Sequence, residues 1–189
     1  MLVVSSALYY PKYIAENTRA ENLAAVLSSV ASTTLDARTK EADCLGENNS
    51  PDHACTPGAV FPATVATICV SGYSASVRNV PDKVHKAVFA EYGIPYPQPR
   101  GSYEVDHLIP LAIGGSNDIA NLFPQPAAPA PGFREKDLVE VYLQEQVCAG
   151  KVALNAAQVQ IADDWFTIYK NLAPADITRL KAKYRNWSN

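Results

Sequence analysis

The segment Tyr103–Leu122, with the sequence YEVDHLIPLAIGGSNDIANL, decides which fold and site we expect for this chain. Residues 103–108 alternate in a way that is typical of a strand, and Pro110 ends the pattern because proline cannot donate to a strand ladder. Neighbouring side chains on a strand point to opposite faces, so Asp106 and His107 can serve one site only where the strand ends or bends. The segment therefore predicts a strand that carries a polar pair at its end.

A tight loop is expected to follow this strand. Gly114-Gly115 permits a sharp backbone turn, and residues 116–118 supply Ser, Asn and Asp oxygens for turns and caps. The chain then returns to Asn121, which we expect near His107. An amide at that position can fix either the imidazole ring or the backbone of the loop, since a neutral imidazole holds one N–H and presents its other nitrogen to water.

The pair Asp106-His107 carries the chemistry that we expect. Hydrolysis of a phosphodiester needs a deprotonated water, stabilisation of charge at the phosphate and relief of charge on the leaving oxygen. A histidine base beside one divalent ion meets these needs, and a carboxylate is a natural ligand for that ion. An isolated Asp-His pair is usually a surface or capping feature, so it is the surrounding strand, turn and asparagine that favour a catalytic site.

The rest of the chain predicts an α+β fold with more helix than strand. Apolar periodicity, prolines in first turns and glycines at ends set the helix boundaries. Helices are predicted over residues 13–30, 81–92 and 134–148, over 155–172, where Asn155 and Gln158 resemble a capping box, and from Pro174 to near Trp187. Short strands are predicted over residues 65–70 and 74–77, and a proline-rich loop over residues 124–132.

The length of 189 residues suits one well-buried domain with an appendage. We expect an N-terminal helical appendage, or the remnant of an export or anchor segment, over residues 1–43, then a main domain over 44–172 and a C-terminal helix over 173–189. Met1–Tyr10 is apolar but too short to span a bilayer, and it lacks the basic start and cleavage site of a signal peptide. No stable membrane span is therefore expected in this chain.

The net charge of −3 and the pI of about 5.6 argue against a broad basic surface that coats nucleic acid. They do not exclude a nuclease, because a metal ion supplies positive charge at the phosphate being cut and a few Lys and Arg side chains can hold its neighbours. Any binding of nucleic acid is expected to be weak and sensitive to salt.

Four cysteines, Cys44, Cys55, Cys69 and Cys148, are present without zinc-finger spacing. Their even number and wide spacing suit two disulfides, although free buried thiols are the alternative. Of the three possible pairings, Cys44–Cys55 with Cys69–Cys148 closes one short loop and one long loop. Disulfides would place the chain in a secreted, periplasmic or cell-envelope location.

The stretch DHLIPLAIGGSNDIANL resembles the first two thirds of the ββα-metal finger of HNH endonucleases, also called His-Me finger nucleases. More loosely, ICVSGYSASVR, NLFPQP, REKDLVE and VCAG are similar to small, exported bacterial proteins that carry this signature. The resemblance implies a ββα-metal finger embedded in a mostly helical, disulfide-bonded single domain. It implies that Asp106 is a metal ligand, His107 the general base and Asn121 the asparagine that orients the base.

The last member of the family pattern is missing. Family members place a His or Asn on the following helix, and this sequence has neither there. Asp137 is the residue that we expect to complete the metal site with Asp106, and Arg134 or Lys136 would hold a phosphate. The implied cofactor is a divalent metal, Mg²⁺ first, with Mn²⁺, Ni²⁺ or Zn²⁺ as alternatives.

The function expected from the sequence is a metal-dependent endonuclease that hydrolyses nucleic acid, with DNA favoured over RNA as the partner. The alternative is a catalytically silent extracellular binding module that retains the HNH scaffold. The acidic pI and the missing final His support that alternative.

Overall fold

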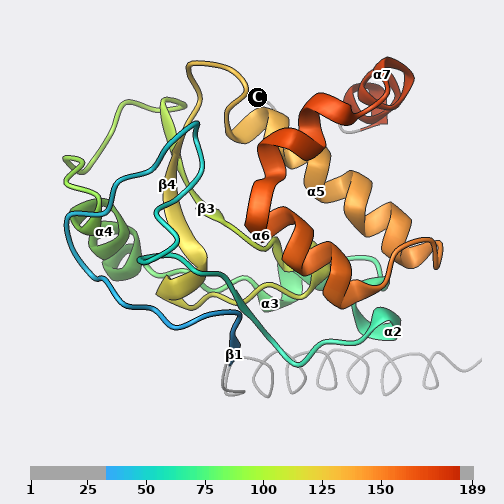
Figure 1. Ribbon diagram of the computed structural model, residues 1–189, viewed down its shortest axis with the longest axis horizontal. Helices are drawn as coiled ribbons and strands as arrows, with labels where there is room; N and C mark the ends of the chain where they lie inside the picture. Colours follow the sequence, from blue (N-terminus) through green and yellow to red (C-terminus); the bar gives the residue numbers. More distant parts are fainter. Residues whose placement is uncertain (1–32, 184–189) are drawn as a thin grey trace, which may run out of the picture.

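The computed structural model describes residues 33–183 and has an α+β architecture. In Figure 1 a two-stranded antiparallel hairpin lies between helix α4 (Asp82–Glu91) on one side and the long helices α5 (Phe133–Cys148) and α6 (Leu154–Asn171) on the other. Helix α7 (Pro174–Lys183) packs against α5 through Leu180, which is fully buried. The predicted fold class is therefore confirmed at the level of α+β with disulfides.

The hairpin consists of β3 (Tyr103–His107) and β4 (Leu122–Pro126), which pair in register from Tyr103↔Pro126 to His107↔Leu122. The strand predicted around Asp106 is confirmed, but the predicted proline-rich loop is wrong in its first three residues because β4 runs through them. Backbone hydrogen bonds from Leu108 N to Asn121 O and from Ala127 N to Ser102 O fix the alternation of the ladder. This alternation gives Pro124 and Pro126 positions where no N–H is needed, so both prolines fit a strand.

Helix α5 forms as its apolar spacing predicts. Its inward face includes Leu138, Val141 and Val147, all of them buried. The capping box predicted from Asn155 at the start of α6 is wrong, because the N-cap is Ala153 and no side chain caps the helix. Gln158 instead points inward and donates to the carbonyl of Ile113 at 2.8 Å.

Residues 65–68 and 73–77 are helical, so the predicted strands over residues 65–70 and 74–77 are wrong. They form α2 (Val65–Ile68) and α3 (Tyr73–Val77). The hydroxyl of Thr64 accepts from Thr67 N, and Thr67 Oγ1 accepts from Thr64 N, which satisfies donors at the start of α2. Val65 and Val70, whose β-branched side chains favoured strands, are exposed and pack against no sheet.

The N-terminal part of the described chain joins the main fold. Strand β1 (Thr33–Thr34) pairs with β2 (Ala59–Val60), so residues from 33 onward are not separate from the domain that follows. The helix predicted over residues 13–30 and the predicted end of the last helix near Trp187 lie outside the described residues. Within residues 33–183, no helix is long and apolar enough to cross a membrane.

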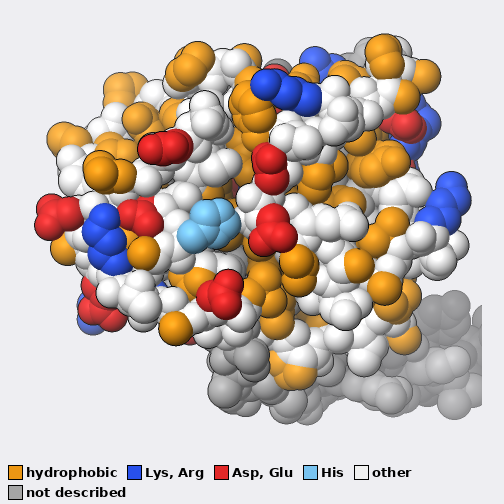
Figure 2. Space-filling view, viewed as in Figure 1, with side chains coloured by type: hydrophobic (Ala, Val, Ile, Leu, Met, Phe, Trp, Pro, Cys, Tyr) orange, Lys and Arg blue, Asp and Glu red, His pale blue; other side chains and the backbone are white. Residues whose placement is uncertain are grey.

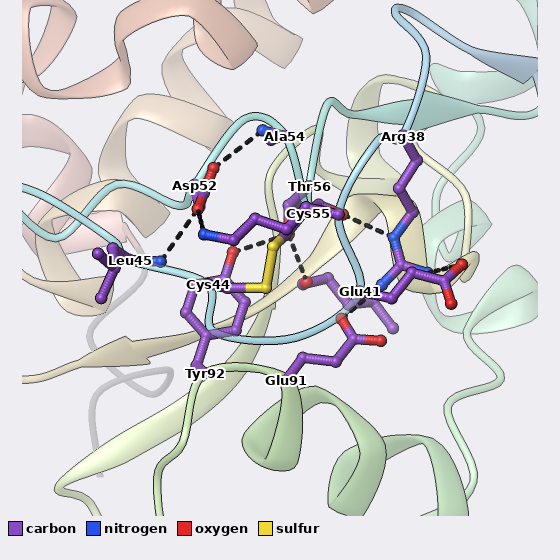
Figure 3. Close-up of a disulfide and its surroundings, with 12 residues drawn as sticks. Arg38, Glu41, Cys44, Leu45, Asp52, Ala54, Cys55, Thr56, Glu91 and Tyr92 are labelled. Carbon is purple, nitrogen blue, oxygen red and sulfur yellow. Dashed lines mark hydrogen bonds and ion pairs between the residues drawn. A yellow bond between two sulfur atoms is a disulfide. The ribbon is translucent and has the colours of Figure 1, made fainter.

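All four cysteines are paired, as Cys44–Cys55 and Cys69–Cys148, which confirms two disulfides. The first is buried, and the second links the C-terminal ends of α2 and α5 across 79 residues. Figure 3 shows that polar contacts surround the first disulfide. Arg38 donates to the carbonyl of Cys55 at 2.8 Å and pairs with Glu91 of α4. The short disulfide loop is thereby fastened to α4.

The loop between β3 and β4 contains two 3₁₀ turns, η1 (Leu111–Ile113) and η2 (Ile119–Asn121). Gly115 forms a bridge with Val60, and its backbone passes against the carbonyl of Ile109. A Cβ atom at Gly115 would lie 1.7 Å from that oxygen. The loop can therefore close only with glycine at this position.

We predict that Gly115→Ala lowers the free energy of unfolding by about 3 kcal/mol, because the backbone must shift to relieve the overlap. Urea denaturation monitored by tryptophan fluorescence measures this loss. Gly150→Ala is the matched control, since Gly150 has a φ of +68° but nothing within 4 Å of an added Cβ. The control should lose only about 1 kcal/mol. Equal losses in the two variants would contradict the close approach at Gly115.

Candidate functional site

His107 lies at the end of β3, with only 2% of its surface exposed. Its Nε2 lies 3.2 Å from Oδ1 of Asn117. The orientation of this amide is fixed, because its Nδ2 donates to the carbonyl of Val77 at 2.7 Å and its Oδ1 also accepts from Asn79 N at 3.2 Å. An oxygen therefore faces the ring, so Nε2 carries the proton and Nδ1 is the unprotonated nitrogen of the neutral imidazole.

The surroundings of His107 favour this neutral form. Burial lowers its pKa from 6.5 to about 4, which outweighs the neighbouring Asp106 carboxylate and the Asn117 hydrogen bond, both of which raise it. Arg78 and Lys136 are positive neighbours that lower the pKa further. The imidazole is consequently uncharged at neutral pH, and this is the state that a general base requires.

This lowered pKa predicts a contribution of His107 to acid sensitivity. The unfolded chain takes up a proton near pH 6.5, whereas the folded chain does so only near pH 4, so stability falls as pH falls through that window. Between about pH 7.5 and about pH 4.5, the stability of the wild type relative to His107→Gln should fall by about 2–3 kcal/mol. Urea denaturation at both pH values measures this difference, and comparison with the variant subtracts other titrating groups. A pH-independent difference would contradict burial of a neutral imidazole.

Asn121 fixes the loop rather than the ring. Its Oδ1 accepts from the backbone N–H of Ala59 and of Ile109, at 3.3 and 2.9 Å. Its Nδ2 donates to the carbonyls of Ile109 and Ser116, both at 2.9 Å. The expectation that Asn121 orients the base is thus corrected, since the amide that contacts the imidazole belongs to Asn117. The sequence predicted that residues 116–118 form a turn, but it did not indicate that Asn117 contacts the imidazole.

Lys136 reaches from the first turns of α5 to the end of β3 and is fully buried. Its Nζ donates to the backbone carbonyl of His107 at 2.7 Å and to Oε1 of Glu140 at 2.6 Å. It also lies 3.0 Å from Oδ2 of Asp106 in an ion pair. That Asp106 oxygen is itself buried and has no hydrogen-bond partner among the described residues, while Oδ1 accepts from the N–H of His107. One ammonium group therefore joins strand and helix at this point.

The charges around Lys136 are strongly coupled. Burial lowers the pKa of this lysine, but Asp106 and Glu140 together raise it well above its ordinary value, so the ammonium stays charged. Burial raises the pKa of both Asp137 and Glu140, and repulsion from Asp106 adds to this effect, while Lys136 opposes it. Asp106 and Glu140 thus share one buried cation.

The residues at this position do not fit the expected divalent ion. Asp106 and Asp137 were the predicted ligands, but the Asp106 carboxylate is already paired with the ammonium of Lys136. Within the described part of the chain, no group of three or more His, Cys, Asp or Glu side chains is arranged to hold a metal. Metal ions in proteins are normally held by several such side chains together. We therefore assign no chemical step to a metal here.

The predicted phosphate-binding residues differ in their accessibility. Lys136 has 0% exposure and cannot contact a substrate, which corrects that expectation. Arg134 is exposed and stacks over the ring of Phe133 at 4.5 Å. Arg78, which follows α3, is also exposed, and its charge acts on His107 and on Glu104. Arg78 was not predicted from the sequence, because it is far from His107 along the chain and only the fold brings its charge close to the imidazole.

The face of the molecule shown in Figure 2 has no continuous basic area. Isolated Lys and Arg side chains lie among acidic and apolar ones on this face. This agrees with the net charge of −3 and with weak, salt-sensitive binding of any polyanion.

Comparisons with known proteins add no family assignment. No family model matches the chain, and neither a curated protein nor a solved structure matches it significantly.

Proposed function

We propose that this chain is an HNH-type endonuclease that hydrolyses phosphodiester bonds of nucleic acid with His107 as its general base. The observation that carries the proposal is the contact of His107 Nε2 with Oδ1 of Asn117 at 3.2 Å. It leaves Nδ1 as the basic nitrogen, at the end of a strand where Asp106 precedes the histidine. A fixed tautomer is what a histidine base needs when it takes a proton from water.

The order of elements supports this proposal. β3, the loop, β4 and α5 follow one another in the order of a ββα finger, and α5 contacts the end of β3 through Lys136. The four hydrogen bonds of the Asn121 amide hold the loop that connects the strands. The loop in turn supports Asn117, which contacts the base. We therefore propose that the active site lies at the end of β3, beside Asn117.

The proposed reaction is an in-line attack of water on phosphorus. Nδ1 of His107 takes a proton as the water oxygen forms its bond to phosphorus and the bond to the ester oxygen breaks. The leaving oxygen takes a proton from solvent, and the proton on Nδ1 is returned to solvent. The products are a phosphomonoester and an alcohol, so atoms and charges balance. Exposed Arg78 is proposed to contact the phosphate, because a guanidinium matches phosphate oxygens in geometry and charge.

This role for Arg78 predicts a binding defect. Arg78→Ala should raise KM about 10–100-fold with a smaller effect on kcat, because a charge-assisted contact to the phosphate is lost. Steady-state cleavage of a fluorescent oligonucleotide at low salt measures both constants. Arg100→Ala is the control, since Arg100 is exposed in the turn before β3. An unchanged KM in Arg78→Ala would remove Arg78 from the phosphate site.

The experiment that tests the proposed function is a cleavage assay of the purified full-length protein. Double-stranded DNA, single-stranded DNA and RNA are each incubated with EDTA, Mg²⁺ or Mn²⁺. We expect new phosphate ends on at least one polymer, with DNA favoured, and loss of cleavage in His107→Ala. The proposal fails if no polymer is cut under any of these conditions, or if the wild type and His107→Ala cut equally.

A second candidate function is the catalytically silent extracellular binding module. The burial of His107 and the complete burial of Lys136 favour it, because a polymer contacts only exposed groups. The assay above separates the two functions, since a silent module leaves every substrate intact. Both candidates are consistent with an oxidising environment, in keeping with the two disulfides, and we propose export from the cytoplasm.

A further inference from the structure

We infer that the ammonium group of Lys136 takes the place of a divalent cation at the end of β3, so that this site excludes metal and operates without it. The statement about catalysis rests on the proposed function, whereas the statement about metal exclusion stands on the contacts of Lys136 alone.

The ligands of Lys136 are those of a small cation site. Nζ is surrounded by a carboxylate oxygen of Asp106, a carboxylate oxygen of Glu140 and the carbonyl oxygen of His107, at 3.0, 2.6 and 2.7 Å. Carboxylates and backbone carbonyls are the oxygen donors that hard divalent ions select. Here the distances are those of N–H···O contacts, and the same oxygens already have a positive partner.

The environment of the Asp106 carboxylate also indicates that it depends on the ammonium of Lys136. Oδ2 of Asp106 is buried and makes no hydrogen bond within the described residues. Its sole described cationic neighbour within ion-pair distance is Lys136, at 3.0 Å. A buried carboxylate oxygen without a compensating charge is costly, so this oxygen depends on the ammonium.

A divalent ion cannot be added while Lys136 stays in place. The ion would have to approach the same oxygens, and it would then lie within a few ångströms of a buried positive charge in a medium that screens weakly. The lysine side chain is fully buried, so displacement would also leave its stem without packing partners or its charge without ligands. Occupation by lysine and occupation by metal are therefore mutually exclusive.

The inference assigns different roles in catalysis to Lys136 and to the exposed arginines. Lys136 neutralises Asp106 and Glu140 and fixes the backbone of the base through the His107 carbonyl, but it does not touch substrate because it is buried. It is a positioning residue. Contact with the phosphate is left to exposed arginine, with Arg78 as the first candidate.

The first test is a calorimetric titration of the full-length wild type with Mn²⁺, with Asp106→Asn as reference. We expect no saturable binding to the wild type that depends on Asp106. A one-site isotherm in the wild type that disappears in Asp106→Asn would overturn the inference. This titration requires neither a substrate nor the folding of a lysine variant.

The second test removes the ammonium. In Lys136→Ala the oxygens of Asp106, Glu140 and the His107 carbonyl lose their cation, so Mn²⁺ should now bind and raise the melting temperature. At a metal concentration about one hundred times Kd, the folding equilibrium should shift about a hundredfold. Lys86→Ala is the control, because Lys86 also pairs with a carboxylate four residues away on a helix but is exposed. The control should gain nothing from Mn²⁺.

The second test remains informative if Lys136→Ala does not fold in EDTA. Refolding of the variant on addition of Mn²⁺ would then support the inference, because the ion supplies the missing charge. A Lys136→Ala chain that gains no stability from Mn²⁺, whether folded or unfolded at the start, counts against a cation position at Nζ.

Cleavage in EDTA separates failure of the inference from failure of the proposed function. We expect the wild type to cut equally well in EDTA and in Mg²⁺. Cleavage that EDTA abolishes and Mg²⁺ restores would overturn the inference and leave a nuclease. If no nucleic acid is cut under any condition, the proposed function fails, and the Mn²⁺ titrations still decide whether Lys136 excludes metal.

Discussion

Replacing His107 by alanine is expected to lower the rate of phosphodiester cleavage about 10²–10⁴-fold, the usual contribution of a positioned general base. The base is lost while Asn117 keeps its bond to the Val77 carbonyl, so the loop around the site retains a support. Single-turnover cleavage of an end-labelled oligonucleotide, at saturating protein, measures the chemical step directly.

His53→Ala is the matched control for this prediction, because His53 is exposed in the loop closed by the first disulfide. The control should cleave at the wild-type rate. Circular dichroism of both variants shows whether the fold is retained. Equal rates for wild type and His107→Ala would exclude His107 as the base, and equal losses in both variants would indicate a general effect of removing histidine.

Replacing Lys136 by methionine is expected to lower the free energy of unfolding by about 3–5 kcal/mol. Methionine fills a similar volume, so the loss comes from charge: Asp106 and Glu140 lose their buried cation, and the His107 carbonyl loses its donor. Urea denaturation measures the change. Lys86→Met is the matched control on α4, where the ion pair with Asp82 is exposed, and it should change stability little.

A second variant shows whether the cost in Lys136→Met arises from the orphaned carboxylates. Adding Asp106→Asn and Glu140→Gln to Lys136→Met removes both buried negative charges, so part of the lost stability should return. A triple variant that is less stable than Lys136→Met would contradict an electrostatic origin. A small loss in Lys136→Met itself would mean that the lysine is not an essential partner of either carboxylate.

Local sequence was sufficient to predict β3 and α5. Pro110 ends the strand pattern, and Leu138, Val141 and Val147 recur at helical spacing, so each element is specified within its own residues. The helices α2 and α3 were not predicted, because Val65 and Val70 favour strands by propensity. Tertiary context overrides that preference, since no sheet is available for those side chains and Thr64 caps a helix.

The extent of β4 shows a second limit of predicting secondary structure from local sequence. Two prolines in the stretch that follows Leu122 predict a loop, since proline removes a backbone donor. They are tolerated because the register with β3 gives both of them positions outside the hydrogen-bonded pairs. That register depends on the connecting loop and on both strands, so proline content alone could not reveal it.

The sequence predicted the strand that carries Asp106 and His107, but not the contacts that surround the two side chains. Asp106 and His107 are adjacent in sequence, and the strand that contains them has a local signal. Lys136 contacts the carbonyl of His107 across a separation of 29 residues, so only the packing of α5 could place it there. The choice between Asn117 and Asn121 as partner of the imidazole likewise depends on which amide the loop turns inward.

The central claim of an endonuclease is tested most directly by covalently closed circular DNA, which offers no ends to an exonuclease. Supercoiled plasmid and a circular single strand are incubated with the full-length wild type and with His107→Ala in the same buffer, and the products are separated by electrophoresis. The account predicts that the wild type nicks or linearises at least one of the circles and that His107→Ala leaves it closed. Circles that stay intact with the wild type, or that are opened equally by both proteins, would contradict it.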